Sequence, residues 1–272
     1  NLLPSTQQRL SFANSNFFMK IGIIGLGLIG GSLFKDLSEV YDVVAVSQSQ
    51  NGDRIFKTFD VLKDRDIVFV CTAMNKTLKV LDELENILNP KTIVTDVCSL
   101  KQFVCQKQRP YNFIPSHPMA GTEHKGFEHS FKGLFKGAKW VLIGATKQLR
   151  NKAIEPLIEI IEFVGAKPIF ATAEAHDEAA AMISHMPMVL AQALVLATKN
   201  NPLALEMAAS GFRDMTRLAL SNEEMACDMV NMNHKNIEQS ILNLYKSIGE
   251  LLTDKYPETI SEIKQIRAKM YQ

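Results

Sequence analysis

With 272 residues, 46% of them hydrophobic and 22% charged, the sequence has the composition of a globular protein large enough for two domains. Its 30 Lys and Arg residues against 29 Asp and Glu residues give a formal charge of +1, without the basic excess of nucleic-acid-binding proteins. No apolar run approaches the roughly 20 residues that a membrane helix needs. We therefore expect neither nucleic acid nor a membrane as a partner.

The cysteines and the N-terminal segment indicate the compartment. Cys71, Cys98, Cys105 and Cys227 form no C-x-x-C pair and no zinc-type spacing, so we expect a reduced, cytoplasmic protein. Residues 1–18 are polar and aperiodic and lack the charged start and long apolar core of a secretory signal. We interpret them as an extension or an upstream remnant and assign them no function.

Between residues 19 and 171, short runs rich in Val and Ile alternate with helical segments. Such runs, nearly continuous in apolarity, are typical of strands buried on both faces of a parallel sheet. With helices expected at 28–39, 76–88 and 151–164, the pattern predicts a Rossmann-type doubly wound α/β dinucleotide-binding domain. The expected strands are 20–25, 42–46, 66–71, 92–96, 112–115, 140–144 and 167–171.

The first βα turn contains a G-x-G-x-x-G sequence, which directly follows a strand and begins a helix. In this context Gly25 permits a tight turn, Gly27 lets the backbone approach a pyrophosphate, and Gly30 lets the helix pack close to the strand. The N-terminus of the helix adds free N–H groups that favour phosphate. We therefore expect a dinucleotide site that comprises Gly25, Gly27, Leu28, Ile29, Gly30, Ser47, Ser49 and Thr72.

The end of the second strand leaves the choice of cofactor open. NAD-preferring domains usually have an Asp or Glu there, which binds the ribose 2′-hydroxyl and repels a 2′-phosphate. This strand instead ends Val46-Ser47-Gln48-Ser49-Gln50, and Arg54 follows a few residues later. Because serines can donate to either a hydroxyl or a phosphate, we expect NAD or NADP without a preference.

Polar residues follow two strands at the edge of the sheet where ligands bind in such folds. The segment TDVCSLK places Asp96, Ser99 and Lys101 after the strand 92–96. The segment PSHPMAG places His117 after the expected strand 112–115. We expect Lys101 to be a surface charge at the start of a helix.

His117 is a candidate general base. Pro118 disfavours helical backbone at His117 and holds it extended, as a positioned base requires. Histidine titrates near neutral pH, so it can accept a proton from an alcohol as hydride leaves. From the residues alone, a loop histidine bonded to backbone is the alternative. His117, His124 and His129 form no H-E-x-x-H or similar pattern, so we expect no metal site.

After residue 172 the strands stop, and we expect an all-α domain over 172–272. Its Ala-rich first stretch contains Pro187, which we expect to kink the helix. A later stretch has apolar residues at alternating spacings of four and three, which is typical of one apolar helix face. These residues are Ile237, Ile241, Leu244, Ile248 and Leu251.

The segments GIIGLGLIGGS, TDVCSLK, SHPMAGTEHKGFEHS, HDEAAAMISHMP and GFRDMTR occur in this order between about residues 19 and 230. In order and spacing they resemble the TyrA family of prephenate/arogenate (cyclohexadienyl) dehydrogenases, and HPMAGTE with FRDMTR is the most specific combination. The resemblance implies a cytoplasmic homodimer that oxidises prephenate or arogenate at C4, transfers hydride to NAD(P)+ and releases CO2. The helical domain would dimerise, and a cleft between the domains would hold the substrate.

The same resemblance implies roles for individual residues. His117 would accept the proton of the C4 hydroxyl, Ser99 would hydrogen-bond that hydroxyl and the histidine, and Arg217 would bind a substrate carboxylate. From the residues alone, Arg217 could instead pair with Asp214 on a helix surface. His185, in the Ala-rich helix, could instead be a core histidine. The expected pocket-lining residues are Thr122, Glu123 and His185.

Two positions depart from the family pattern. Met188 stands where several members have a second histidine, and Ala226 stands where many have a tryptophan. They leave open whether the substrate carries the pyruvyl side chain of prephenate or the alanyl side chain of arogenate. The alternatives are a β-hydroxyacid-type dehydrogenase of similar architecture and a non-catalytic protein that senses a dinucleotide.

Overall fold

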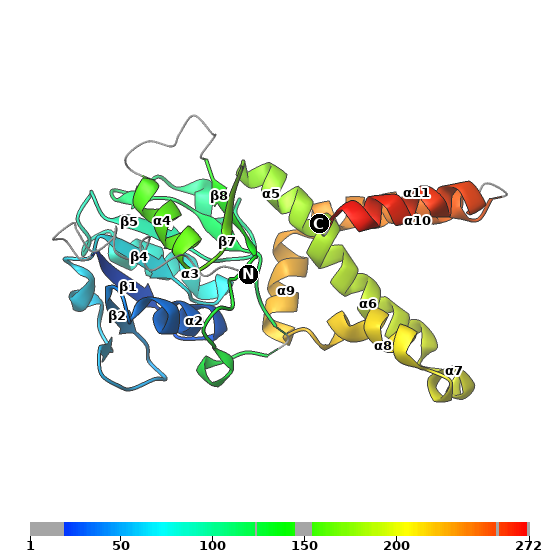
Figure 1. Ribbon diagram of the computed structural model, residues 1–272, viewed down its shortest axis with the longest axis horizontal. Helices are drawn as coiled ribbons and strands as arrows, with labels where there is room; N and C mark the ends of the chain where they lie inside the picture. Colours follow the sequence, from blue (N-terminus) through cyan, green and yellow to red (C-terminus); the bar gives the residue numbers. More distant parts are fainter. Residues whose placement is uncertain (1–18, 123, 145–153, 254–255, 271–272) are drawn as a thin grey trace, which may run out of the picture. The chain divides into compact units, whose positions relative to one another are not determined.

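The computed structural model describes residues 19–122, 124–144, 154–253 and 256–270 (Figure 1). These residues fall into two compact units. The first ends at Asp177 and also includes Leu220–Asp228, whereas the second comprises Glu178–Ala219 and the chain from Met229 onward. Glu123 and the segment 1–18, both interpreted from the sequence, lie outside the described residues.

A six-stranded parallel sheet in the order β3-β2-β1-β4-β5-β6 forms the centre of the first unit. Strand order reverses between β1 and β4, and ligands of such sheets bind outside the carboxyl ends of the strands at this switch point. The predicted doubly wound sheet is confirmed. Its strands are β1 (Lys20–Ile24), β2 (Asp42–Val46), β3 (Ile55–Phe56), β4 (Ile67–Val70), β5 (Ile93–Asp96) and β6 (Asn112–Phe113).

Helices bury both faces of this sheet, as the continuous apolarity of the strands predicts. One buried cluster joins Ile21 and Ile23 of β1 to side chains of α2 (Leu28–Leu37) and α4 (Glu155–Phe163). A second cluster joins β2, β4 and β5 to α3 (Met74–Leu84). The first unit also contains the short 3-10 helices η2 (Phe59–Leu62), η3 (Val104–Gln106) and η4 (Phe127–His129).

The last two predicted strands do not extend the large sheet. They are β8 (Lys139–Ile143) and β9 (Lys167–Ala171), which with β7 (Ser116–Pro118) form a separate three-stranded sheet. Strand β7 is antiparallel to β8, whereas β9 is parallel to it. Pro115 explains the change, because it has no N–H for the large sheet and its carbonyl accepts a 2.9 Å hydrogen bond from Ile143.

The second unit is helical in its described residues. Its first helix contains a π-turn just before Pro187, where a residue without an N–H cannot continue the regular ladder. This turn packs against α10, and α6 packs against α8. The elements after Thr172, of which the start of α5 and most of α9 belong to the first unit, are α5 (Ala173–Ala180), η6 (Ala181–His185), α6 (Met186–Thr198), α7 (Pro202–Glu206), α8 (Ser210–Thr216), η7 (Arg217–Leu220), α9 (Glu223–Met232), α10 (His234–Leu251) and α11 (Tyr256–Met270).

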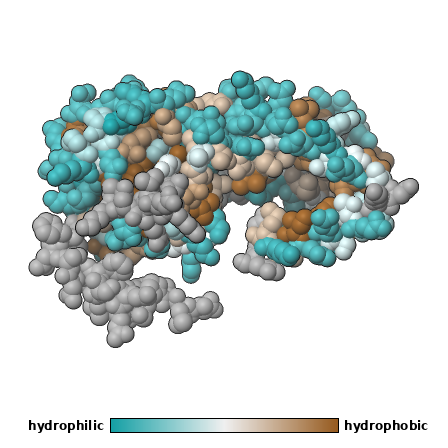
Figure 2. Space-filling view, turned by 90° about the horizontal axis from the view of Figure 1, so that it is seen from above, coloured by the Kyte–Doolittle hydropathy of each residue, from teal (hydrophilic) through white to brown (hydrophobic). Residues whose placement is uncertain are grey.

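The continuous helical run Ala173–Thr198 has 26 residues and a mean hydropathy of 1.7 in its most apolar window, of which 28% is buried. By length and composition alone this helix could cross a membrane, in contrast to our expectation from the sequence. A helix that is covered by another subunit has the same composition. Apolar side chains reach the surface among polar ones in the space-filling view (Figure 2).

Candidate active site

The three glycines of the turn after β1 meet the steric requirements of a dinucleotide site. Gly25 has a φ of 90°, and a Cβ there would lie 2.6 Å from the carbonyl oxygen of Cys71. A Cβ on Gly30 would overlap the carbonyl oxygen of Gly25, so only glycine lets α2 approach β1 this closely. At Gly27, which caps α2, a Cβ would meet only open space. The residues therefore fit a pyrophosphate beside the free N–H groups of α2.

The ammonium of Lys57, which could not be predicted from the sequence, binds the turn after β2. Nζ of Lys57 donates to the carbonyl oxygens of Ser47 and Gln50 at 2.9 and 2.7 Å. The Ser47 hydroxyl is buried and accepts from the N–H of Gln50 at 3.2 Å, whereas Ser49 is exposed. Lys57 directly follows the two-residue strand β3, and a lysine beyond such a short strand carries no recognisable pattern.

Thr72 follows β4 at the switch point of the sheet. Its hydroxyl lies 3.0 Å from the hydroxyl of Thr77, which also lies 3.1 Å from the sulfur of Cys98. Burial, reinforced by the nearby negative charge of Asp96, raises the pKa of the Cys98 thiol to about 12. The thiol is therefore a neutral packing group at neutral pH.

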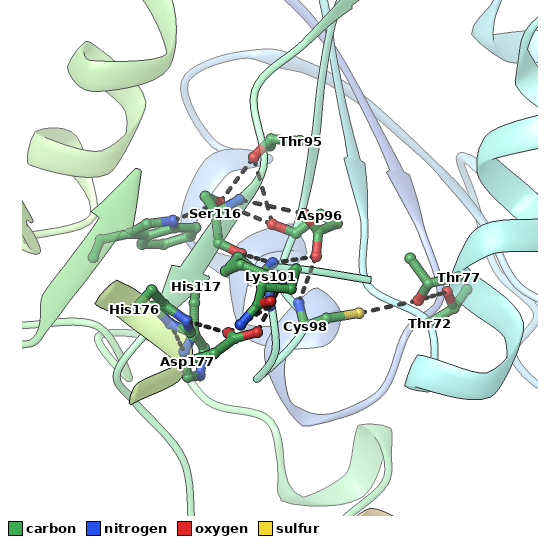
Figure 3. A network of polar contacts seen from close by, with 12 residues as sticks. Thr72, Thr77, Thr95, Asp96, Cys98, Lys101, Ser116, His117, His176 and Asp177 are labelled. Atoms are coloured by element: carbon green, nitrogen blue, oxygen red, sulfur yellow. Dashed lines mark hydrogen bonds and ion pairs between the residues drawn. The ribbon is translucent and has the colours of Figure 1, made fainter. Parts of the chain in front are cut away.

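A fully buried polar cluster lies behind the ends of β5 and β7 (Figure 3). Nζ of Lys101 pairs with the carboxylate of Asp96, and both side chains are 0% exposed. Nζ also donates to the carbonyl oxygen of Ser116 at 2.6 Å. The Ser116 hydroxyl donates to the carbonyl oxygen of Asp96 at 2.8 Å and accepts from Nε1 of Trp140 at 2.9 Å.

The expectation that Lys101 is a surface charge is therefore wrong. The chain after β5 forms turns, with no helix beginning at Lys101 among the described residues. The carboxylate of Asp96 is buried at the end of a central strand, and a buried charge needs a partner of opposite sign. The ammonium of Lys101 supplies that charge and fixes the carbonyl group that immediately precedes His117.

His117 lies in β7, opposite Val141 of β8, and its backbone is extended. Its half-buried ring contacts His176, with 2.9 Å between Nδ1 of His117 and Nε2 of His176. Nδ1 of His176 lies 2.8 Å from Oδ1 of Asp177. The sequence did not reveal the roles of His176 and Asp177, although these residues form the His-Asp pair that begins the segment HDEAAAMISHMP.

The remaining predicted site residues have different surroundings. Ser99 is half-buried in the turns between β5 and Lys101, and the exposed hydroxyl of Thr122 accepts from the N–H of His124 at 3.2 Å. The structure supplies positions for these side chains in the first unit. Their contacts with a substrate stay predictions.

Two predicted substrate-binding residues belong to the second unit. His185 is 1% exposed in the π-turn, and its Nδ1 lies 3.1 Å from Nδ2 of Asn233, as in the core-histidine alternative. Arg217 is exposed at the C-terminal end of α8. Oδ1 of Asp214, the alternative partner of Arg217, lies 3.8 Å from Nε of Arg213. Participation of Arg217 in substrate binding stays a prediction.

The comparisons with known proteins agree in one family. Residues 41–181 match the family described as "Prephenate dehydrogenase, nucleotide-binding domain", and residues 172–263 match "Prephenate dehydrogenase, dimerization domain". The curated prephenate dehydrogenase of Bacillus subtilis is 30% identical over 274 residues, which are 92% of this chain and 70% of the relative.

Two solved structures resemble this chain along nearly its whole length. The arogenate dehydrogenase of Synechocystis is 30% identical with a TM-score of 0.77, and the match covers 93% of this chain and 99% of the other. The prephenate dehydrogenase of A. aeolicus, in complex with hydroxyphenyl propionate and NAD+, is 25% identical with a TM-score of 0.80. That match covers 94% of this chain and 100% of the other.

Proposed function

Because this chain belongs to the prephenate dehydrogenase family, it is a dehydrogenase of tyrosine biosynthesis, and we propose that His117 is the base of its reaction. One observation carries the proposal. His117 is held in extended backbone in the nucleotide-binding unit, and its ring is oriented by the hydrogen bond between its Nδ1 and Nε2 of His176. A general base needs a ring that is held in one orientation.

We propose that the substrate is prephenate or arogenate, each of which carries a hydroxyl on C4 and a carboxylate on C1 of a cyclohexadiene ring. His117 takes the hydroxyl proton while the electron pair of the C4–H bond leaves as hydride. The bond from C1 to the carboxylate then breaks, its electron pair makes the ring aromatic, and CO2 leaves. His117 returns its proton to the resulting phenolic oxygen, so protons and electrons balance.

NAD(P)+ is the cofactor of this enzyme, and when bound it accepts the hydride. We propose that the backbone of Gly25, Gly27, Leu28, Ile29 and Gly30 holds its pyrophosphate. The fit is supported by the open space over Gly27 and the close approach of α2 at Gly30. Ser47, Ser49 and Thr72 line the adjacent strand ends, where no Asp or Glu marks a preference for NAD.

We propose that Ser99 shares the substrate hydroxyl with His117 and that Arg217 binds a substrate carboxylate. The guanidinium is exposed and can form two parallel hydrogen bonds with a carboxylate, which a lysine cannot. Thr122, Glu123 and His185 are the proposed pocket-lining residues. The names of the relatives support either prephenate or arogenate as the substrate, since they include both prephenate and arogenate dehydrogenases.

We propose a homodimer formed through the second unit. Residues 172–263 match a dimerization domain, and large apolar side chains of this unit are exposed in the single chain. Exposed apolar area of this extent marks an interaction surface. The side chains include Ile183, Leu196, Met207, Met215, Tyr245 and Ile266. Light scattering at micromolar concentration should give twice the mass of the chain, and a monomer would contradict the dimer.

We propose that the enzyme works in the cytoplasm with a small-molecule substrate and without nucleic acid or membrane. The four cysteines are free, as in proteins from reducing compartments. Cell fractionation tests this assignment. Recovery of the native protein in the membrane fraction would contradict it and would give the apolar run Ala173–Thr198 a membrane role.

Initial rates with prephenate and arogenate, each with NAD+ and NADP+, test the proposed function. We expect turnover of at least one of these substrates, with equal amounts of reduced cofactor and CO2. Turnover of a β-hydroxyacid in place of both cyclohexadienes would indicate the β-hydroxyacid-type alternative. Tight cofactor binding without turnover of any substrate would indicate the sensing alternative.

A further inference from the structure

Three hydrogen-bonded side chains end at His117, and we infer that the inner two, His176 and Asp177, are positioning residues that set the protonated nitrogen of the base. Nδ1 of His117 lies 2.9 Å from Nε2 of His176, whose Nδ1 lies 2.8 Å from Oδ1 of Asp177. His176 and Asp177 are only 4% and 3% exposed. The inference rests on the proposed role of His117 as the base.

The hydrogen-bond partners decide which nitrogen of each ring carries a proton. The carboxylate of Asp177 can only accept, so Nδ1 of His176 donates to it. The inference takes His176 as neutral, so that its Nε2 accepts and Nδ1 of His117 donates to it. In this tautomer the lone pair of the neutral His117 ring is on Nε2, and Nε2 is the atom to which the inference assigns the substrate proton.

Asp177 is itself held rigidly from two sides. Its Oδ1 and Oδ2 accept hydrogen bonds from the backbone N–H groups of Lys101 and Gln102, at 2.8 and 2.9 Å. Lys101 also binds the carbonyl oxygen of Ser116, the residue before His117. Lys101 therefore fixes both ends of the chain of side chains, namely the Asp177 carboxylate and the backbone of β7 (Figure 3).

This arrangement favours proton transfer at Nε2 in both directions. When Nε2 accepts the hydroxyl proton, His117 becomes a cation whose Nδ1–H still donates to His176. The negative charge of Asp177 stabilises that cation across the neutral ring of His176, because charges interact more strongly in a buried site than in water. Without His176, the ring of His117 could flip or change tautomer, and part of the enzyme would carry its proton on Nε2.

Two substitutions at His176 separate positioning from folding. His176→Phe keeps a ring but removes both nitrogens, whereas His176→Gln offers an amide oxygen that can accept from His117. For His176→Phe we expect kcat to fall about 10- to 100-fold, a part of the 10²–10⁴-fold that a positioned base contributes. We expect KM and the Kd of NAD+ to change less than about twofold, since the binding groups remain. His176→Gln should recover part of kcat.

The pH profile gives a readout that a merely structural role would not move. In His176→Phe the protonated form of His117 loses the attraction of Asp177, so the acid limb of kcat/KM should move to lower pH. The matched control is His129→Phe, which removes an imidazole whose side chain is 45% exposed and should leave kcat and the profile unchanged. A folded His176→Phe with unchanged kcat and an unchanged profile would overturn the inference.

Nitrogen NMR of 15N-histidine-labelled enzyme, without substrate or cofactor, tests the tautomer directly. We expect neutral His117 to carry its proton on Nδ1 in the wild type and partly on Nε2 in His176→Phe. A wild-type His117 protonated on Nε2 would overturn the inference. Should His176→Phe not fold, the wild-type spectrum and His176→Gln decide the same question.

The two levels of the proposal can fail separately. If the wild type turns over neither cyclohexadiene, the proposed function fails, and the spectrum still decides how His117 is protonated. If His117→Asn is inactive while His176→Phe has normal kcat, only the positioning role fails.

Discussion

The ammonium of Lys101 and the carboxylate of Asp96 form an ion pair in which both side chains are 0% exposed. The pair does more than neutralise a buried charge. Asp96 accepts from the N–H of Cys98 at 2.9 Å, and Lys101 binds the carbonyl oxygen of Ser116 at 2.6 Å. Cys98, two residues after the end of β5, and Ser116, the residue before His117, are thereby fixed to one another.

Replacing Lys101 by Met should strongly destabilise the first unit. Loss of one partner of a buried pair leaves an uncompensated charge, which costs about 3–5 kcal/mol. Chemical denaturation measures this loss, and Lys101→Met/Asp96→Asn should recover part of it. The control is Lys63→Met, because the Lys63 side chain is 58% exposed in its pair with Asp60 and its loss should leave the free energy of unfolding nearly unchanged. Equal stability of both Met variants would contradict the buried pair.

Replacing Asp36 by Asn should stabilise the protein at neutral pH. Burial raises the pKa of Asp36 above its ordinary 3.8, although a backbone hydrogen bond from Gly133 opposes this. Oδ2 is buried without a hydrogen-bond partner in the described part of the chain. Because the pKa of Asp36 is higher in the folded protein than in the unfolded chain, its contribution to the free energy of unfolding is complete at pH values below the unfolded-state pKa. This contribution is lost as the pH rises through the folded-state pKa. The amide avoids the charge and still accepts from Gly133.

Thermal unfolding of Asp36→Asn and wild type between pH 4 and 8 checks the sign. The gain in Tm should be largest at the neutral end and should shrink as pH falls toward the ordinary value of 3.8. The exposed Asp60, whose pKa is lowered by its hydrogen bond and charge interaction with Lys63, gives the opposite control. Asp60→Asn should cost a little Tm at neutral pH and less as pH falls. A gain for Asp36→Asn that grows toward acid pH would contradict the assignment.

Replacing Lys57 by Ala should weaken cofactor binding, and NADP+ more than NAD+. The ammonium ties the carbonyl groups of Ser47 and Gln50 together after β2, where the adenosine ribose binds in this fold. Its loss frees the turn for both cofactors and also removes a positive charge that favours a 2′-phosphate. Titration of NADH and NADPH fluorescence measures both Kd values. An equal or smaller loss for NADPH would show that Lys57 acts on the turn alone.

Replacing Arg217 by Ala should chiefly raise KM for the cyclohexadiene. A guanidinium that binds the carboxylate equally in the ground and transition states lowers KM without changing kcat. We expect a rise of about 10- to 100-fold, since a charge-assisted bidentate pair contributes about 1.5–3 kcal/mol. Arg213→Ala, which removes a neighbouring guanidinium in an exposed pair with Asp214, is the matched control. Unchanged KM and kcat in Arg217→Ala would make this residue structural.

The glycine-rich turn and the parallel sheet could be predicted from the sequence because each depends on local rules. Gly25 and Gly30 stand where side chains would overlap backbone, and the apolar runs of β1, β2, β4 and β5 are buried on both faces. The extended backbone of His117 follows from Pro118 in the same way. Local sequence therefore determines the backbone conformation at these residues and the burial of these strands.

The features that depend on distant contacts could not be predicted. His117 and His176 are 59 residues apart in sequence, and Lys101 and Asp177 are 76 apart. Strands β3 and β7 have two and three residues, too few for a periodic pattern. Lys101 looked like a surface charge because nothing in its neighbourhood shows that Asp96 is buried and needs a cation. The sequence predicted His117 as a candidate base but not the two residues that we infer to orient it.

The kinetics of His117→Asn test the role of the base most directly. Initial rates on prephenate and arogenate should show kcat reduced about 10²–10⁴-fold or more, because asparagine cannot accept the proton. The Kd of NAD+ or NADP+, measured by titration on the same preparation, should change less than about twofold. Turnover by a correctly folded His117→Asn at the wild-type rate would contradict the assignment of His117 as the proton acceptor.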